Sequence, residues 1–131
     1  MNYKEIISLI SNKDFHPIYF LMGEEPFYID KISDYIAENV LESQEKEFNQ
    51  SVLYGKDLEV AQIISEAKQF PFGSKKRVVI IKEAQNIKNI EDLESYLNNP
   101  QPSTLLVICY KYKKLDKRKK FTKTLVKKAL L

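Results

Sequence analysis

Short apolar runs alternate along this chain with segments in which apolar residues recur at helical spacing. Runs such as 18–22 are apolar throughout, which is typical of strands buried on both faces of a sheet. Strands that alternate with helices favour a parallel sheet covered by helices. The sequence therefore predicts a three-layer α/β fold whose strands lie at 18–22, 48–54, 77–82 and 104–110.

Helices are predicted between these strands. Pro26 fits the first turn of one helix, where a missing N–H costs nothing, and Asp57 is a suitable N-cap for another. The second helix must end before Pro71, because proline excludes the helical conformation at the preceding residue. Its predicted buried side holds Leu58, Ala61, Ile64 and Ala67. The other helices are expected at 1–11, 26–40 and 90–97 and from about Asp116, the last burying Phe121, Leu125 and Ala129.

The composition fits one globular domain. The chain has 131 residues, of which 44% are hydrophobic and 30% charged. It contains no apolar stretch near the roughly 20 residues that cross a bilayer, and no basic segment followed by an apolar run at its start. The single cysteine, Cys109, lies in an apolar run, so a buried inert thiol is expected rather than a disulfide or a zinc cluster. We expect a cytoplasmic protein without a membrane partner.

The net charge of +3 hides a strong asymmetry. Between Lys111 and Lys128, nine lysines and Arg118 are opposed by Asp116 alone, a local balance of +9 that leaves −6 for the rest of the chain. Such a basic segment on an acidic body indicates either a polyanion or acidic neighbour, or simply a solvated helix face.

The turn after the first strand is where nucleotide-binding α/β domains hold phosphate. Residues 23–30 read GEEPFYID, and the second glycine, the lysine and the hydroxyl of a phosphate loop would fall on Tyr28, Ile29 and Asp30. None of these fits. Glu24 and Glu25 would repel phosphate but suit the first turn of a helix.

Other catalytic patterns are equally weak. His16 is the only histidine, and a nucleophile paired with a base is not found. Asp30 and Asp34 share a helix face, but they are better interpreted as exposed acids near Lys31 and Lys46. The sequence therefore predicts no catalytic site, metal site or cofactor in this domain.

Three segments together carry a family resemblance. They are YFLMGEEPFYIDKI at 19–32, PFGSKKRVVII at 71–81, and the stretch from Asn99-Pro100 through STLLVI at 103–108 to KKLDKRKK at 113–120. In order and spacing they resemble the delta subunit of the bacterial DNA polymerase III clamp loader across nearly the whole chain.

The resemblance implies an AAA+-like domain, a P-loop NTPase fold whose nucleotide loop is degenerate and non-functional. Residues 1–131 would form the N-terminal domain of a longer chain, without its lid and collar domains. The implied function is to bind the sliding clamp (the beta subunit) and help to open it during DNA replication, without hydrolysing ATP. Other clamp-loader subunits would be further partners, with DNA contacted indirectly or through the basic segment.

The resemblance also places the clamp contact at the end of the helix before the third strand, on Gln69, Phe70, Pro71 and Phe72. Pro71 stands where many relatives have leucine, so the anchor pair is Phe72 with either Pro71 or Phe70. From the residues alone, two aromatic side chains beside a helix-breaking proline indicate either a partner site or rings that cap the core. Gln69 either ends the helix or hydrogen-bonds the clamp backbone.

Two basic groups leave alternatives open. Lys75, Lys76 and Arg77 either steer encounter with an acidic clamp or form a solvated entrance to the strand. Residues 117–120 (Lys117, Arg118, Lys119 and Lys120) are candidates for contact with DNA phosphates or with a neighbouring subunit. The alternative function is a DNA-binding α/β domain that acts through this basic C-terminal helix.

Overall fold

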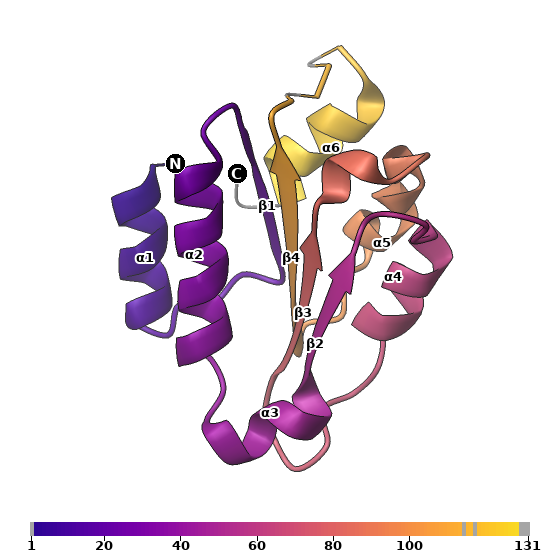
Figure 1. Ribbon diagram of the computed structural model, residues 1–131. Coiled ribbons are helices and arrows are strands. Elements are labelled where there is room, and N and C mark those ends of the chain that lie inside the picture. Colours follow the sequence, from indigo (N-terminus) through magenta and orange to yellow (C-terminus); the bar gives the residue numbers. More distant parts are fainter. Residues whose placement is uncertain (1, 114, 117, 129–131) are drawn as a thin grey trace.

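The computed structural model has a four-stranded parallel sheet at its centre (Figure 1). It describes residues 2–113, 115–116 and 118–128, the last three only in their backbone. The strands are hydrogen-bonded in the order β1-β4-β3-β2, so β1 and β2 form the two edges. Their bounds are β1 Ile18–Gly23, β2 Gln50–Tyr54, β3 Arg77–Lys82 and β4 Thr104–Lys111.

Helices cover both faces of this sheet (Figure 1), which confirms the predicted three-layer α/β fold. Two helices pack on one face, α1 (Tyr3–Ser11) and α2 (Pro26–Asn39). The other face is covered by α4 (Val60–Ala67), two 3₁₀ turns η1 (Ala84–Asn86) and η2 (Ile90–Leu93), α5 (Glu94–Asn98) and α6 (Lys120–Lys128). A further helix, α3 (Ser43–Asn49), lies at the end of the sheet where the strands begin.

The continuous apolar runs reflect burial on both faces of the sheet. In β1, Tyr19 and Leu21 point to the core under α1 and α2, whereas Ile18 and Phe20 point to the opposite core. Successive side chains of a strand point to opposite faces. Every position of such a strand is therefore apolar, and the pattern recognised in the sequence is the pattern that the two cores require.

The start of β2 was predicted wrongly. A strand was expected from residue 48, but Phe48 and Asn49 end helix α3 and the strand begins at Gln50. Helix α3 starts with a reciprocal cap in which the Glu42 N–H donates to Glu45 Oε1 at 3.0 Å. Glu45 thus occupies the Glu/Gln position of a capping box, a feature of a helix start that the hydrophobic periodicity did not carry.

The predicted start of α4 was also wrong. Asp57 lies in a turn with a φ of 61°, and Glu59 is the N-cap, with its N–H donating to Gln62 Oε1 at 2.8 Å. The buried face of the helix also differs from the prediction. Ala67 is buried as predicted, together with Val60 and Ile63; Leu58 and Ile64 are only partly buried, and Ala61 is exposed.

The C-terminal half departs from prediction in two details. The segment 90–97 begins with the 3₁₀ turn η2 and becomes α-helical only at Glu94. The last helix begins at Lys120 rather than near Asp116. Phe121 and Leu125 are buried as predicted, whereas Ala129 lies outside the described residues.

The paired acids of α2 have different partners from those expected. Asp30 pairs with Lys111 of β4 at 2.8 Å, and Asp34 pairs with Lys82 of β3 at 3.6 Å. The hydrogen bond to Asp30 raises the pKa of Lys111 above its ordinary value. Each pair joins α2 to the end of a neighbouring strand, so lysines distant in sequence replace the predicted Lys31 and Lys46.

Cys109 is fully buried, as predicted, and burial raises the pKa of its thiol. A helix long and apolar enough to cross a membrane does not occur within the described part of the chain.

Candidate protein-interaction site

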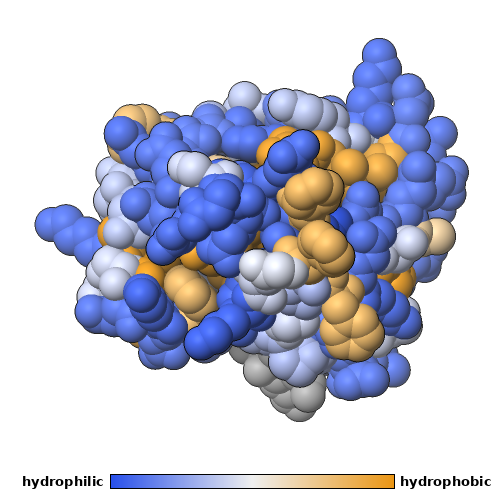
Figure 2. All heavy atoms as spheres, turned by 90° about the horizontal axis from the view of Figure 1, so that it is seen from below, coloured by the Kyte–Doolittle hydropathy of each residue, from blue (hydrophilic) through white to orange (hydrophobic). Residues whose placement is uncertain are grey.

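The predicted clamp-contact residues lie in the loop 68–76 between α4 and β3. This loop lies beside α3 at the end of the sheet where the strands begin (Figure 1). Gln69, Phe70 and Phe72 are exposed and Pro71 is half-buried. Figure 2 views the molecule from this end and shows a row of hydrophobic side chains among hydrophilic ones. The four residues are therefore together on one accessible surface.

Both phenylalanine rings point away from the core. Phe70 is 78% exposed and Phe72 is 72% exposed, so the interpretation that they cap the core is wrong. Scattered apolar side chains are normal on a protein surface, but large ones grouped at one turn are typical of an interaction site. The exposure of this pair is thus the observation on which a functional interpretation can rest.

The backbone of the loop explains this exposure. Helix α4 ends at Ala67, before Pro71 as predicted. Immediately after Phe72, Gly73 adopts a φ of 66°, in the left-handed region that favours glycine because other residues carry a Cβ that crowds the backbone. The chain therefore bends at Gly73, directly after Phe72, whose ring lies on the outside.

Phe48 is a third exposed aromatic side chain at this site, which the sequence analysis missed. It is 61% exposed, and its ring centroid lies 5.7 Å from that of Phe72 with an interplanar angle of 64°. This is the tilted, edge-to-face arrangement that aromatic pairs prefer. Because Phe48 was assigned to a strand, its position beside the loop could not be recognised; the glutamate capping pattern before it was the available signal.

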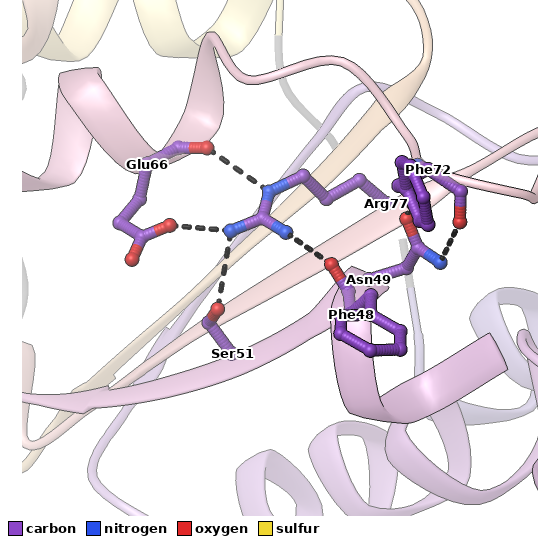
Figure 3. A network of polar contacts seen from close by, with 6 residues as sticks. All are labelled: Phe48, Asn49, Ser51, Glu66, Phe72 and Arg77. Atoms are coloured by element: carbon purple, nitrogen blue, oxygen red, sulfur yellow. Dashed lines mark hydrogen bonds and ion pairs between the residues drawn. The ribbon is translucent and has the colours of Figure 1, made fainter.

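Asn49 joins α3 to the loop (Figure 3). Its side-chain Nδ2 donates to the Phe72 carbonyl at 2.7 Å, and the Phe72 N–H donates to Asn49 Oδ1 at 2.7 Å. The same Nδ2 also donates to the Glu45 carbonyl at 2.9 Å. Asn49 is only 1% exposed, so its two bonds to Phe72 are made from a buried side chain and fix the loop where it carries the aromatic ring.

Arg77 holds the segments on either side of the site together (Figure 3). Its guanidinium ion-pairs with Glu66 of α4 and donates to the Phe48 carbonyl at 3.1 Å and to Ser51 Oγ at 3.2 Å. Its Nε donates to the Glu66 carbonyl at 3.2 Å. A buried guanidinium needs such partners, because an unpaired charge is costly away from water. The end of α3, the start of β2 and the end of α4 therefore share one internal cation.

The basic triplet beside the rings is divided by the fold. Arg77 is buried, so the expectation that it faces a partner or solvent is wrong. Lys75 is exposed, and Lys76 is half-buried with its Nζ donating to the Pro102 carbonyl at 3.2 Å. Of this triplet, only Lys75 and Lys76 thus contribute positive charge to the surface near Phe72.

The basic segment lies at the other end of the molecule, around the start of α6. Arg118 ion-pairs with Asp116 at 3.1 Å, which lowers the pKa of that carboxyl, and Lys119 pairs with Glu91 at 2.7 Å. Lys120 is exposed, whereas Lys117 lies outside the described residues. Two of the four predicted cations are therefore engaged with acids of the chain itself, although both remain exposed.

The segment 23–30, which was predicted to be a degenerate phosphate loop, is also at the end opposite to Phe72, since it follows β1. A pocket of about 690 Å³ lies there, lined in part by Gly23, Glu24, Glu25 and Tyr28. Glu24 and Glu25 are exposed. The prediction that they lie in the first turn of α2 is wrong, because Glu25 is the N-cap and Glu24 precedes it.

Similarity to known proteins points to one family. The family model for the DNA polymerase III delta subunit matches residues 19–131. DNA polymerase III subunit delta of Bacillus subtilis is 36% identical over 126 residues, which cover 88% of this chain and 36% of the relative. A solved structure of the Bacillus subtilis DNA clamp loader delta protein has a TM-score of 0.87 and 32% identity, covering 98% of this chain and 41% of the other. The chain thus spans little more than a third of the curated relative.

Proposed function

The chain belongs to the family of DNA polymerase III delta subunits, and from this premise we propose that it binds a sliding clamp through the exposed phenylalanines of the α4–β3 loop. In this role it helps to open the clamp ring during DNA replication and does not itself hydrolyse ATP. The observation that carries the proposal is the exposure of Phe70 and Phe72 at a turn held by buried polar contacts.

The energetics of the surface support a protein partner. Burying one phenylalanine ring in a partner pocket contributes roughly 1.5–3 kcal/mol before the cost of association. Aromatic anchors of this kind carry much of the binding energy at many interfaces. In the proposal, Phe72 is the principal anchor, with Phe70 and Pro71 as neighbours. Gln69, which is exposed in the same loop, hydrogen-bonds the partner's backbone.

Charge supports the encounter rather than the final affinity. Lys75 is exposed two residues after Gly73, and Lys76 lies next to it. Exposed charges mainly accelerate association with an oppositely charged surface, and salt screens them. An acidic clamp is the partner that this arrangement favours.

The remaining assignments follow the family. In the proposal, residues 1–131 form an AAA+-like N-terminal domain, and the lid and collar domains belong to the part of the relatives that this chain does not span. The other clamp-loader subunits are further partners. The absence of phosphate-loop residues at Tyr28, Ile29 and Asp30 supports a domain that contributes binding rather than nucleotide hydrolysis.

Replacing Phe72 with alanine tests the proposal. We expect the dissociation constant for the clamp of the same organism to rise at least about tenfold, because the lost ring burial corresponds to roughly 1.5–3 kcal/mol. Isothermal titration calorimetry measures the affinity, and circular dichroism verifies that the fold is intact.

Phe27→Ala is a matched control. Phe27 is also an exposed phenylalanine, 55% accessible, but it lies in α2 at the opposite end of the sheet. It should leave clamp affinity unchanged. Equal affinities for wild type and Phe72→Ala would remove Phe72 from the site, and a wild-type chain that does not bind the clamp would refute the proposal as a whole.

DNA binding through the basic segment is the second candidate, favoured by the net charge of +9 between Lys111 and Lys128. Changing Lys119 and Lys120 to glutamate should weaken DNA binding at low ionic strength and reduce the slope of log affinity against log salt by about 2, as expected for two lost phosphate contacts. Fluorescence anisotropy with a labelled duplex measures both quantities. Lys4→Glu with Lys13→Glu is the control, at one exposed lysine in the first turn of α1 and one just after its C-cap. A wild-type chain without salt-sensitive DNA binding would exclude this candidate.

A further inference from the structure

We propose that Asn49 is a positioning residue that holds Phe72 in a binding-ready conformation, and that Phe48 is the third aromatic side chain of the same docking surface. The occupant of this surface is the sliding clamp, so the inference rests on the proposed function. The observations that carry it are the paired hydrogen bonds between Asn49 and the Phe72 backbone and the contact between the Phe48 and Phe72 rings.

The Asn49 carboxamide binds Phe72 as a neighbouring strand would. It accepts from the Phe72 N–H and donates to the Phe72 carbonyl, both at 2.7 Å, and so satisfies both backbone polar groups of one residue. Asn49 is 1% exposed while the Phe72 ring is 72% exposed. The Asn49 side chain that makes the hydrogen bonds is therefore buried, while the Phe72 ring is exposed to solvent.

This arrangement lowers the cost of binding. A loop that is mobile when free must be ordered when a partner binds, and that lost entropy reduces the affinity. Asn49 orders the backbone of Phe72 in advance through two bonds that span 23 residues of sequence. Such preorganisation strengthens binding without any contact between Asn49 and the partner.

Phe48 extends the surface that Phe72 begins. Phe48 directly precedes Asn49 in the chain. The hydrogen bonds from Asn49 to Phe72 therefore also hold the Phe48 ring beside the Phe72 ring. The Phe48 carbonyl accepts from Arg77, which holds the end of α3 against the sheet, while its side chain remains 61% exposed. With Phe70 at 78% exposure, three phenylalanine rings become available to one partner.

Hydrogen exchange tests the role of Asn49 without a partner. The Phe72 amide should exchange at least about tenfold more slowly in the wild type than in Asn49→Ala, because its acceptor is lost in the variant. The amides of Val79 and Ile80, buried in β3, report whether the fold itself is retained. Equal exchange of the Phe72 amide in both proteins, with β3 protected in both, would overturn the positioning role.

A double-mutant cycle tests the link to binding. Asn49→Ala should weaken clamp binding about tenfold in the wild-type background, equivalent to about 1.4 kcal/mol, and should have little further effect when Phe72 is already alanine. A residue that only maintains the fold would weaken binding equally in both backgrounds. Equal effects would therefore overturn the inference, as would an unchanged affinity of Asn49→Ala.

Phe48→Ala tests the third ring. We expect about a tenfold loss of clamp affinity, with Phe27→Ala unchanged as the matched control. If wild type binds the clamp and Phe72→Ala weakens it while Phe48→Ala does not, the three-ring surface is refuted and the proposed function stands. If wild type does not bind the clamp, the proposed function fails first, and the hydrogen-exchange result still decides whether Asn49 holds Phe72.

Discussion

Replacing Arg77 with alanine is expected to lower the free energy of unfolding by about 3 kcal/mol. The guanidinium is buried and joins the carboxylate and carbonyl of Glu66 to the Phe48 carbonyl and Ser51 Oγ. Its removal leaves these groups without their shared donor and opens space at the ends of α3 and α4. The melting temperature should fall by about 10 °C, as measured by circular dichroism and by urea unfolding.

Two variants control this prediction. Lys75→Ala removes an exposed positive charge two residues earlier and should change stability by less than about 0.5 kcal/mol. Arg77→Met keeps most of the side-chain stem and loses the guanidinium, so it separates packing from polar contacts. An ordinary point mutation lowers the free energy of unfolding by about 1 kcal/mol. If Arg77→Ala lowers it by no more than this, the network contributes little to stability.

Replacing Phe20 with alanine is expected to have the largest effect on stability, a loss of about 3–5 kcal/mol. Phe20 is fully buried in the core between the sheet and α4 to α6. Its ring lies 5.5 Å from that of Tyr110 and 6.2 Å from that of Phe121, between ring centroids. The cavity left by alanine would therefore loosen the contact that holds α6 on the sheet.

Two measurements follow the consequences of this change. Urea unfolding gives the loss of stability, and limited trypsin digestion should cut the lysine-rich segment around α6 faster in Phe20→Ala than in the wild type. Phe27→Ala, with an exposed ring, should change stability by less than about 1 kcal/mol. A loss in Phe20→Ala no larger than that of the control would contradict the central place of Phe20 in this core.

The two predictions separate the roles of the two ends of the molecule. Arg77 supports the end that carries the three phenylalanines, whereas Phe20 supports the attachment of the basic helix. If clamp binding is the function, Arg77→Ala should weaken clamp binding more than a variant in the α6 core that loses the same stability. If the chain binds DNA through α6, the α6-core variant should weaken DNA binding more than Arg77→Ala does.

The strands and the loop that carries Phe70 and Phe72 show which features a local sequence pattern can predict. Continuous apolar runs predicted β1, β3 and β4, because burial on both faces leaves no polar positions in between. The edge strand β2 contains Gln50 and Ser51 and is only partly buried. Pro71 predicted that α4 ends before the rings, because the restriction is imposed within two adjacent residues. The start of β2 was wrong because seven polar-rich residues form helix α3 through capping rather than through a hydrophobic stripe.

What the sequence by itself determined was therefore the layered fold, the end of α4 and the family. The fold and the helix end follow from patterns of residues close together in the chain, and the family from three such segments in their order. The tertiary structure alone decided that Phe48 lies against Phe72, that Asn49 holds the loop and that Arg77 turns inward. These contacts join residues 11–29 positions apart. Hydrophobic periodicity reports which face of an element is buried, but a polar side chain finds its partner only after the elements have packed.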